Sequence, residues 1–283
     1  MYTVSTHGCP ADFLARAEAW LLVREDVHNL ILSLAYARAT EGVDHSSDFY
    51  ATVESEGEIL GCAMRTHPHK VLLTDMPRDV GTPLAAALSE RYQEIPAVLG
   101  PPDAAESLAI AWVALHGGGW RPGLEQRIYR LTSVTTPTGV SGALRLATVD
   151  DIDLGAAWGE GFARDVGHQF STSRESVTDW IEKEALYIWE DESEPVSMAL
   201  ARAGTPKGAR VGFVYTPPEK RRNGYASACV AEVSQRMLDT GLDFCVLYTD
   251  LSNPTSNAIY QQLGYEPIAD VRDFDLVAED VAP

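Results

Sequence analysis

Three consecutive cations stand between two prolines and a glycine in the stretch VYTPPEKRRNGYA, residues 214–226. An apolar segment precedes this stretch and an amphipathic segment follows it, so the cations lie where a strand is expected to turn into a helix. The start of a helix exposes backbone N–H groups, and positive charge around such groups suits a phosphate. A solvated cationic turn that only caps the helix is the alternative. The GxxxxGK[ST] pattern of a nucleotide-binding P-loop is absent.

Two strands and two helices must position this loop. Residues 210–216, RVGFVYT, predict the strand before it. From Tyr225 the apolar residues recur at helical spacing, which predicts an amphipathic helix. Residues 244–248, FCVLY, are apolar on both faces, as is typical of an interior strand. Asn253 and Pro254 then supply the N-cap and the first position of a second helix.

The loop carries the pattern R-x-x-G-x-A, and here residues 143–276 resemble the GNAT superfamily of N-acetyltransferases in the order of their elements. In that family the loop amides hold the pyrophosphate of acetyl-CoA. The resemblance assigns this role to Arg221, Arg222, Asn223, Gly224, Tyr225 and Ala226. It also assigns backbone pairing with the pantetheine arm to Phe213, Val214 and Tyr215. The three cations would then offset the acidity of the chain where an anionic co-substrate docks.

A second match lies downstream, in DLSNPTSNAIYQQLGY, residues 250–265. It resembles the asparagine-bearing loop and helix of the same family. The resemblance implies that Asn253 and Asn257 lie near the pantetheine, and that Tyr260 faces the CoA sulfur as the general acid. The alternative for Tyr260 is a ring that packs the helix against the sheet.

The general base is not identified by the sequence. Family members often carry a Glu in the strand before the phosphate loop, and RVGFVYT has none. Glu160, Asp165 and Asp250 are alternatives that could act through water. No G-x-S-x-G or similar nucleophile pattern appears, so we expect the amine to attack the thioester directly in a ternary complex. His67 and His69 lack a third ligand at metal spacing, so no metal is expected.

The order of elements predicts two copies of one α+β unit. We expect a degenerate GNAT-like domain at residues 1–131, a linker at 132–142 and a GNAT N-acetyltransferase domain at 143–283, each with a mixed, mostly antiparallel sheet flanked by helices. The linker, TSVTTPTGVSG, is rich in Ser, Thr, Gly and Pro and has no charge. The last residues, around 265–276, are expected to form a strand pair.

The first half departs from the acetyl-CoA pattern. Arg78, Gly81 and Pro83 have the spacing of the R-x-x-G-x-A motif, but Pro83 has no amide hydrogen to donate. Nothing in this half matches Asn253 or Tyr260. The first domain is therefore expected to have kept the fold and lost cofactor binding, with a chance match of Arg78 and Gly81 as the alternative.

Composition limits the partners. The 283 residues include 41 Asp and Glu against 22 Lys and Arg, a formal net charge of -19, which argues against nucleic acid and anionic membranes as partners. Cys9, Cys62, Cys229 and Cys245 have no CxxC spacing and are expected to be buried thiols. The N-terminus lacks a signal-peptide pattern and no apolar run is long enough to span a membrane, so a cytoplasmic location is expected.

We therefore expect an acetyl-CoA-dependent N-acetyltransferase that acts on a primary amine, either a small molecule or a peptide. A homodimer is left open. The main alternative is a non-catalytic CoA-binding protein with a regulatory or scaffolding role, which the missing strand Glu allows. The sequence does not identify the amine.

Overall fold

The computed structural model describes residues 2–40, 46–167 and 172–278. Its contacts divide the chain into two units. Unit 1 comprises Met1–Ile128, Asp250–Ser252 and Ile268–Pro283, and unit 2 comprises Tyr129–Thr249 and Asn253–Pro267. The division differs from the one expected from the sequence, because the end of the chain belongs with the first unit and not with the second.

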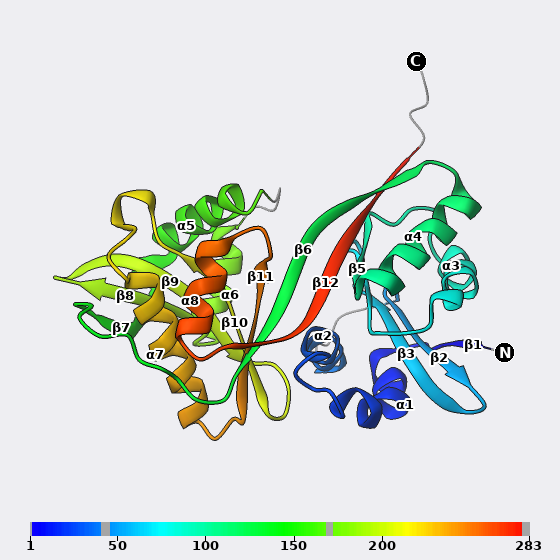
Figure 1. Ribbon diagram of the computed structural model, residues 1–283, viewed down its shortest axis with the longest axis horizontal. Helices are drawn as coiled ribbons and strands as arrows, with labels where there is room; N and C mark the ends of the chain where they lie inside the picture. Colours follow the sequence, from blue (N-terminus) through cyan, green and yellow to red (C-terminus); the bar gives the residue numbers. More distant parts are fainter. Residues whose placement is uncertain (1, 41–45, 168–171, 279–283) are drawn as a thin grey trace, which may run out of the picture. The chain divides into compact units, whose positions relative to one another are not determined.

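Unit 1 is a sheet with helices on it (Figure 1). Its elements are β1 (Thr3–Thr6), α1 (Pro10–Leu22), α2 (Asn29–Thr40), β2 (Phe49–Ser55), β3 (Glu58–Arg65), β4 (Val71–Leu73), a short 3-10 helix η1 (Arg78–Val80), α3 (Gly81–Ser89), β5 (Ala97–Gly100), α4 (Pro102–His116), β6 (Gly119–Leu131) and β12 (Glu266–Val277). Within this unit the strand order is β1-β2-β3-β4-β5-β12-β6. The β4–β5 pair is parallel, whereas β12 runs antiparallel to β5.

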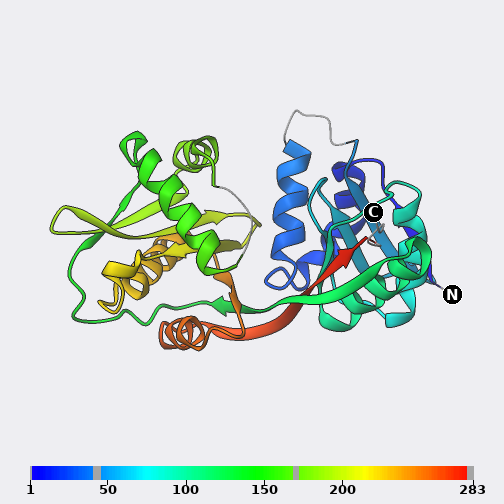
Figure 2. The same cartoon turned by 90° about the horizontal axis from the view of Figure 1, so that it is seen from above.

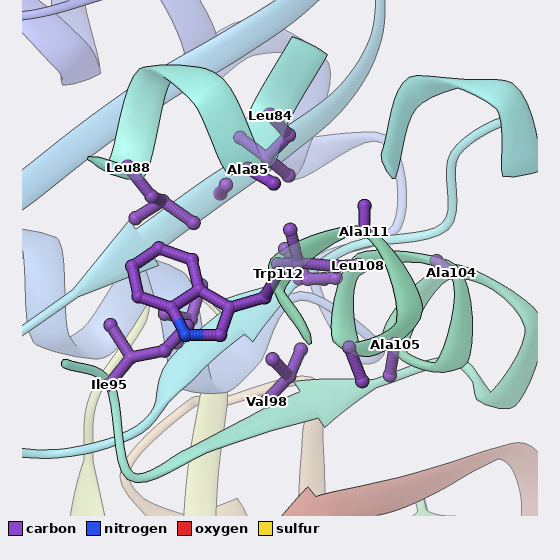
Figure 3. Close-up of a cluster of buried hydrophobic side chains, with 14 of the residues drawn as sticks. Leu84, Ala85, Leu88, Ile95, Val98, Ala104, Ala105, Leu108, Ala111 and Trp112 are labelled. Carbon is purple, nitrogen blue, oxygen red and sulfur yellow. The ribbon is translucent and has the colours of Figure 1, made fainter. Parts of the chain in front are cut away.

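The side chains of β2 alternate between two cores, as the period of a strand requires. Phe49, Ala51 and Val53 are buried in the cluster that α3 and α4 complete. Tyr50 points the other way, with its ring centroid 5.7 Å from that of Phe13 in α1. Trp112 of α4 lies in the middle of the first cluster, between the side chains of α3 and those of β5 (Figure 3).

Unit 2 repeats the arrangement. Its elements are the last residues of β6, then β7 (Ala143–Leu146), η2 (Val149–Asp151), α5 (Ile152–Asp165), α6 (Arg174–Glu182), β8 (Leu186–Asp191), β9 (Glu194–Ala203), β10 (Gly208–Tyr215), η3 (Pro218–Lys220), α7 (Tyr225–Asp239), β11 (Phe244–Asp250) and α8 (Pro254–Gln262). The strand order is β6-β11-β10-β9-β8-β7. Figure 2 shows α5 and α6 on one face of β8–β10 and α7 on the other. This mixed, mostly antiparallel α+β architecture confirms the predicted fold class.

The helices and strands predicted from short sequence patterns are confirmed. The strand before the loop, the helix from Tyr225, the interior strand and the helix after Asn253 all form near their expected bounds. The strand pair expected at residues 265–276 is wrong, because a single strand, β12, covers Glu266–Val277. Residues 268–277 contain no Gly, Pro or Asn to make a turn, which explains the unbroken strand.

The expectation of buried thiols is confirmed for three of the four cysteines and is wrong for Cys9. All four cysteines are free, and Cys62, Cys229 and Cys245 are buried. Burial raises the pKa of each of these three thiols to about 12. Cys9 is partly exposed and its sulfur accepts the backbone N–H of Asp12 at the start of α1. The three buried cysteines therefore remain protonated thiols at neutral pH.

Candidate functional site

As far as the described residues show, strands β10 and β11 pair only at their beginnings. In their parallel pairing, Gly208, Ala209 and Arg210 are opposite Phe244, Cys245 and Val246. In the part of the chain that the structure describes, no register joins them beyond Arg210, although β10 continues to Tyr215 and β11 to Asp250. Backbone groups of a strand inside a sheet require partners. An extended ligand with amide groups could pair here as an added strand would.

A β-bulge accompanies this separation. Gly212 is opposite Leu200 of β9, and Tyr215 is opposite Met198. Between these two pairs β10 therefore contains one residue more than β9. Phe213 lies in the bulge with a φ of 49°, a conformation that costs energy for a residue other than glycine. Bulges of this kind re-aim a strand next to a functional site. The residues expected to pair with pantetheine therefore lie on the diverging part of β10.

The Phe213 ring lies against the helices of unit 2. Its centroid is 5.0 Å from that of Phe162 in α5 and 4.9 Å from that of Trp180 in α6. Tyr215 belongs to the cluster with Trp158 on the same face of the sheet. The bulge thus creates an aromatic wall beside the diverging strands.

The loop between η3 and α7 presents backbone donors. Arg222 has a φ of 67° and Gly224 a φ of 82°, and α7 starts at the next residue. The first helical hydrogen bond runs from the Ala228 N–H to the Gly224 carbonyl, at 3.0 Å, and no side chain caps the helix. Across the described residues, no acceptor is found for the N–H groups of residues 222–227. Such a row of N–H groups at a helix start is suited to an anion.

Two of the three loop cations are engaged by carboxylates. The Lys220 Nζ lies 2.6 Å from Glu194, and the Arg221 guanidinium pairs with Asp165 and donates to the Thr216 carbonyl. Among the described residues, Arg222 makes no ion pair. The prediction that all three cations offset the acidity of the chain is therefore too simple, because two of them are already neutralised locally.

The first turn of α7 is held by residues distant in the sequence. The Tyr225 hydroxyl donates to Asp191, at 2.6 Å, and Ser141 donates to the same carboxylate oxygen. These hydrogen bonds lower the pKa of Asp191. Val140 lies beside Gly224, where an added Cβ would come within 2.8 Å of its Cγ2. No local pattern connects these residues, so sequence analysis missed Val140, Ser141 and Asp191 as supports of the loop.

Both predicted asparagines are used within α8. The Asn253 side chain caps the helix by accepting the Ser256 N–H at 3.0 Å. Asn257 donates to the Asn253 carbonyl at 2.7 Å and accepts from the Tyr129 hydroxyl at 2.9 Å. The structure therefore brings Asn257 to the side of α8 that meets β6, while Asn253 orders the start of the helix. Contact with pantetheine stays a prediction for both.

Tyr260 is partly buried on α8. Its ring lies edge-on to that of Tyr265, with centroids 6.0 Å apart. Burial raises the pKa of Tyr260 to about 12, so the hydroxyl keeps its proton at neutral pH. The edge-on contact also agrees with the packing alternative, so the catalytic role of Tyr260 stays a prediction.

The structure does not select one general base among the three candidates. Asp165 is engaged by Arg221, Asp250 accepts the Ser252 N–H at 2.7 Å, and Glu160 is exposed. Among the described residues, no group of three or more His, Cys, Asp or Glu side chains could hold a metal ion. None of the described helices is long and apolar enough to cross a membrane.

Comparison with known proteins identifies the class. The model of the Acetyltransferase (GNAT) family matches residues 156–265. The match runs from α5 to the end of α8 and includes the diverging strands, the loop and the helix of Tyr260. This part of the chain is therefore a GNAT domain. No curated protein matches the chain.

Solved structures extend the likeness to the whole chain. A GCN5-related N-acetyltransferase from Sphaerobacter thermophilus has a TM-score of 0.65 and 17% identity, with 100% of this chain and 98% of that one covered. A Drosophila protein has a TM-score of 0.69 and 11% identity, with coverage of 97% and 98%. A tandem GNAT protein from the clavulanic acid biosynthesis pathway has a TM-score of 0.54 and 11% identity over the full length of both chains. At these identities the likeness shows the fold, which is that of two GNAT-like domains.

Proposed function

We propose that the protein is an acetyl-CoA-dependent N-acetyltransferase in which a primary amine attacks the thioester directly in a ternary complex. The observation that carries the proposal is the row of N–H groups at residues 222–227 beside the diverging end of β10. A phosphate site and an amide-pairing site next to each other match the two parts of acetyl-CoA. The family match supports the same class of reaction.

The described residues fit the co-substrate. The N–H groups of residues 222–227 would hold the pyrophosphate, where Gly224 lets an oxygen approach the backbone without a Cβ. The backbone of Phe213, Val214 and Tyr215 would pair with the amides of pantetheine. Acetyl-CoA supplies an acetyl group on a thioester, whose leaving group is a thiolate.

The chain's own residues then have three tasks. Strand β10 orients the thioester, so that the neutral amine forms a C–N bond to the carbonyl carbon as the C–S bond breaks. Tyr260 acts as the general acid and donates its hydroxyl proton to the departing sulfur, because the hydroxyl is protonated at neutral pH. The proton of the amine leaves to Glu160, Asp165 or Asp250, directly or through water.

Acetyl-CoA binding should be measured first, by calorimetry on the full chain, with ATP as a control that has phosphates and no pantetheine. Release of free CoA thiol should then be followed with a panel of small amines and peptides. We expect binding and amine-dependent release. Binding without release for any amine would favour the non-catalytic CoA-binding alternative, and absence of binding would overturn both.

A further inference from the structure

Two arginines of unit 2 are directly opposite each other in the sheet. Arg202 on β9 is the register partner of Arg210 on β10. Directly opposed side chains have Cβ atoms about 4.5–5.5 Å apart, and like charges in such a pair are destabilising. In the described part of the chain, neither guanidinium has an ion pair or hydrogen bond with a carboxylate. The chain has a net charge of -19, yet the carboxylates of its described residues do not neutralise these two guanidiniums. An anionic ligand could do so.

Both arginines lie on the face of the sheet that carries α5 and α6. Ala209 and Val211 are buried in the cluster of α7, so Arg210 between them points to the other face. The same reasoning places Arg202 there, since Ala201 belongs to the α7 cluster. Tyr248 is on this face too, because its neighbour Leu247 is in the α7 cluster.

The charge of Arg210 is poorly compensated by these neighbours. Burial lowers the pKa of Arg210, and the positive charge of Arg202 lowers it further, while Tyr248 raises it. A guanidinium stays protonated in proteins even so. Arg210 is therefore a partly buried charge at the last paired position before β10 and β11 diverge.

Open space lies next to this pair. Gly212 is two residues after Arg210 on the same face, and a Cβ added to Gly212 would meet no atom within 4 Å. The next residue, Phe213, places its ring against Phe162 and Trp180. The open position at Gly212 therefore lies along β10 between a cationic residue and an aromatic one, and it adjoins the part of β10 proposed to hold pantetheine.

We propose that Arg202 and Arg210 bind an anionic group, a carboxylate or a phosphate, of the acyl acceptor. The inference rests on the proposed function, and it makes the substrate an amine that also carries an anion. The phosphates of acetyl-CoA are assigned to the loop at the other end of β10, so they do not account for this pair. Arg210 lies three residues before Phe213, about 10 Å along the strand at about 3.3 Å per residue. A small amino acid or amino phosphate can span that distance together with the reach of an arginine side chain.

The test compares matched acceptors with the full-length protein. The pairs are glycine with methylamine, phenylalanine with phenethylamine, and phosphoethanolamine with ethanolamine. In each pair the members differ in the anionic group. We expect kcat/KM to be at least about tenfold higher for the anionic member of one pair, because charge-assisted hydrogen bonds to two guanidiniums are lost with the neutral member. The responding pair tells a carboxylate from a phosphate.

Variants then assign the effect. Arg210→Gln and Arg202→Gln should each remove most of the preference, mainly through KM, and leave the neutral amine and the acetyl-CoA dissociation constant unchanged. Arg210→Lys should restore part of it. Arg236→Gln is the matched control, because Arg236 on α7 already pairs with Glu232 and donates to the Leu144 carbonyl.

Stability separates a binding role from a structural one. Removing one of two opposed cations should leave the melting temperature of the ligand-free protein unchanged or raise it, since the repulsion is relieved. A lowered melting temperature together with equal loss for both members of a pair would show a structural role and overturn the inference. The inference is also overturned if no anionic member is acetylated faster than its neutral counterpart. The proposed function survives that result if neutral amines are acetylated, and fails separately if acetyl-CoA does not bind.

Discussion

The two units contain the same succession of strand, 3-10 helix and helix. In the described residues, only unit 2 leaves space between this strand and the parallel strand next to it. In unit 1, β4 and β5 pair with Val71 opposite Val98 and Leu72 opposite Leu99. Beyond these pairs the strands stay close, since a Cβ on Gly100 would be 2.8 Å from the Leu73 Cβ. In unit 2, β10 and β11 diverge after Arg210. The difference lies in the strands themselves and not only in the loop.

The helices reinforce the difference. In unit 1, α3 packs along α4, the Ser107 hydroxyl donates to the Arg78 carbonyl, and Arg78 pairs with Asp103. A Cβ on Gly81 would lie 2.3 Å from the Ser107 Oγ, so the start of α3 is covered. In the described part of unit 2, α7 and α8 have no comparable packing, and α8 has no buried residue. Unit 1 thus fills with its own side chains the place that unit 2 leaves to a ligand.

The absence of an N–H group at Pro83 does not by itself explain why unit 1 has no space for a ligand. Pro83 was expected to disable the loop by lacking an N–H group. Gly81 has a φ of -51°, an ordinary helical value, whereas Gly224 has a φ of 82°. In the structure, the first loop therefore does not have the conformation that would present its N–H groups.

The largest effect should come from Trp112, which fills the core between α3 and α4 (Figure 3). Trp112→Ala should lower the stability of unit 1 by about 3–5 kcal/mol, because it leaves a cavity. Hydrogen exchange should show lost protection in α3, α4 and β5, with an unchanged acetyl-CoA dissociation constant. Leu115→Ala on the exposed side of α4 is the control and should change little. Weakened acetyl-CoA binding in Trp112→Ala would break the comparison by implicating unit 1.

Gly224→Val tests the loop of unit 2. The added side chain meets Val140 and is strained at positive φ, so the N–H groups lose their arrangement. We expect acetyl-CoA affinity by calorimetry to fall on the order of 100-fold, as several charge-assisted hydrogen bonds weaken. Gly241→Val at the other end of α7 is matched, because Gly241 has a φ of 94° and open space around it. An equal loss in both variants would mean that strain, and not the site, sets the affinity.

Tyr260→Phe tests the proton donor. Phe keeps the edge-on contact with Tyr265 and removes one hydroxyl. Turnover at saturating acetyl-CoA should fall on the order of 100-fold, near the lower end for loss of a general acid, with unchanged cofactor affinity. Tyr265→Phe is the control, since it removes the hydroxyl that meets Ser234 and should affect stability instead. Undiminished turnover in Tyr260→Phe would leave Tyr260 as a packing residue.

The smallest effect concerns acid stability. The buried Asp151 carboxylate accepts two hydrogen bonds from Arg145 and one from the Thr148 N–H, and the Arg145 contact is the main cause of its lowered pKa. A carboxyl whose pKa is lowered on folding stabilises the protein above its unfolded pKa, near 4, and this contribution is lost as pH falls through the folded value. Asp151→Asn should therefore cost about 1–2 kcal/mol at neutral pH and flatten the acid limb of the stability curve.

Glu54→Gln offers the counterpart in unit 1. Arg16, which pairs with Glu54, is largely exposed, and this contact lowers the Glu54 pKa. Solvent screens such a pair, so the acid limb should change less than in Asp151→Asn. Thermal melts between pH 3 and 7 would compare them. A larger change for Glu54→Gln would reverse the expected ranking of the two ion pairs.

Sequence patterns predicted the features of the fold that depend on residues close together in the chain. The Asn253-Pro254 start of α8 and the helical spacing from Tyr225 are local, and both were predicted correctly. The opposition of Arg202 and Arg210 depends on the register of β9 against β10, which no spacing reveals. The anchoring of Tyr225 by Asp191 likewise joins residues brought together by the sheet.

Strand β12 has a consequence for how the protein is made. It lies between β5 and β6 in the sheet of unit 1, although it comes from the last part of the chain. During translation, residues 1–128 therefore leave the ribosome long before β12 does. Until β12 arrives, the edges of β5 and β6 are unpaired and can associate with other chains. Unit 1 cannot complete its sheet until residue 277 has been synthesised. A stop codon before residue 266 would thus damage the unit that is synthesised first.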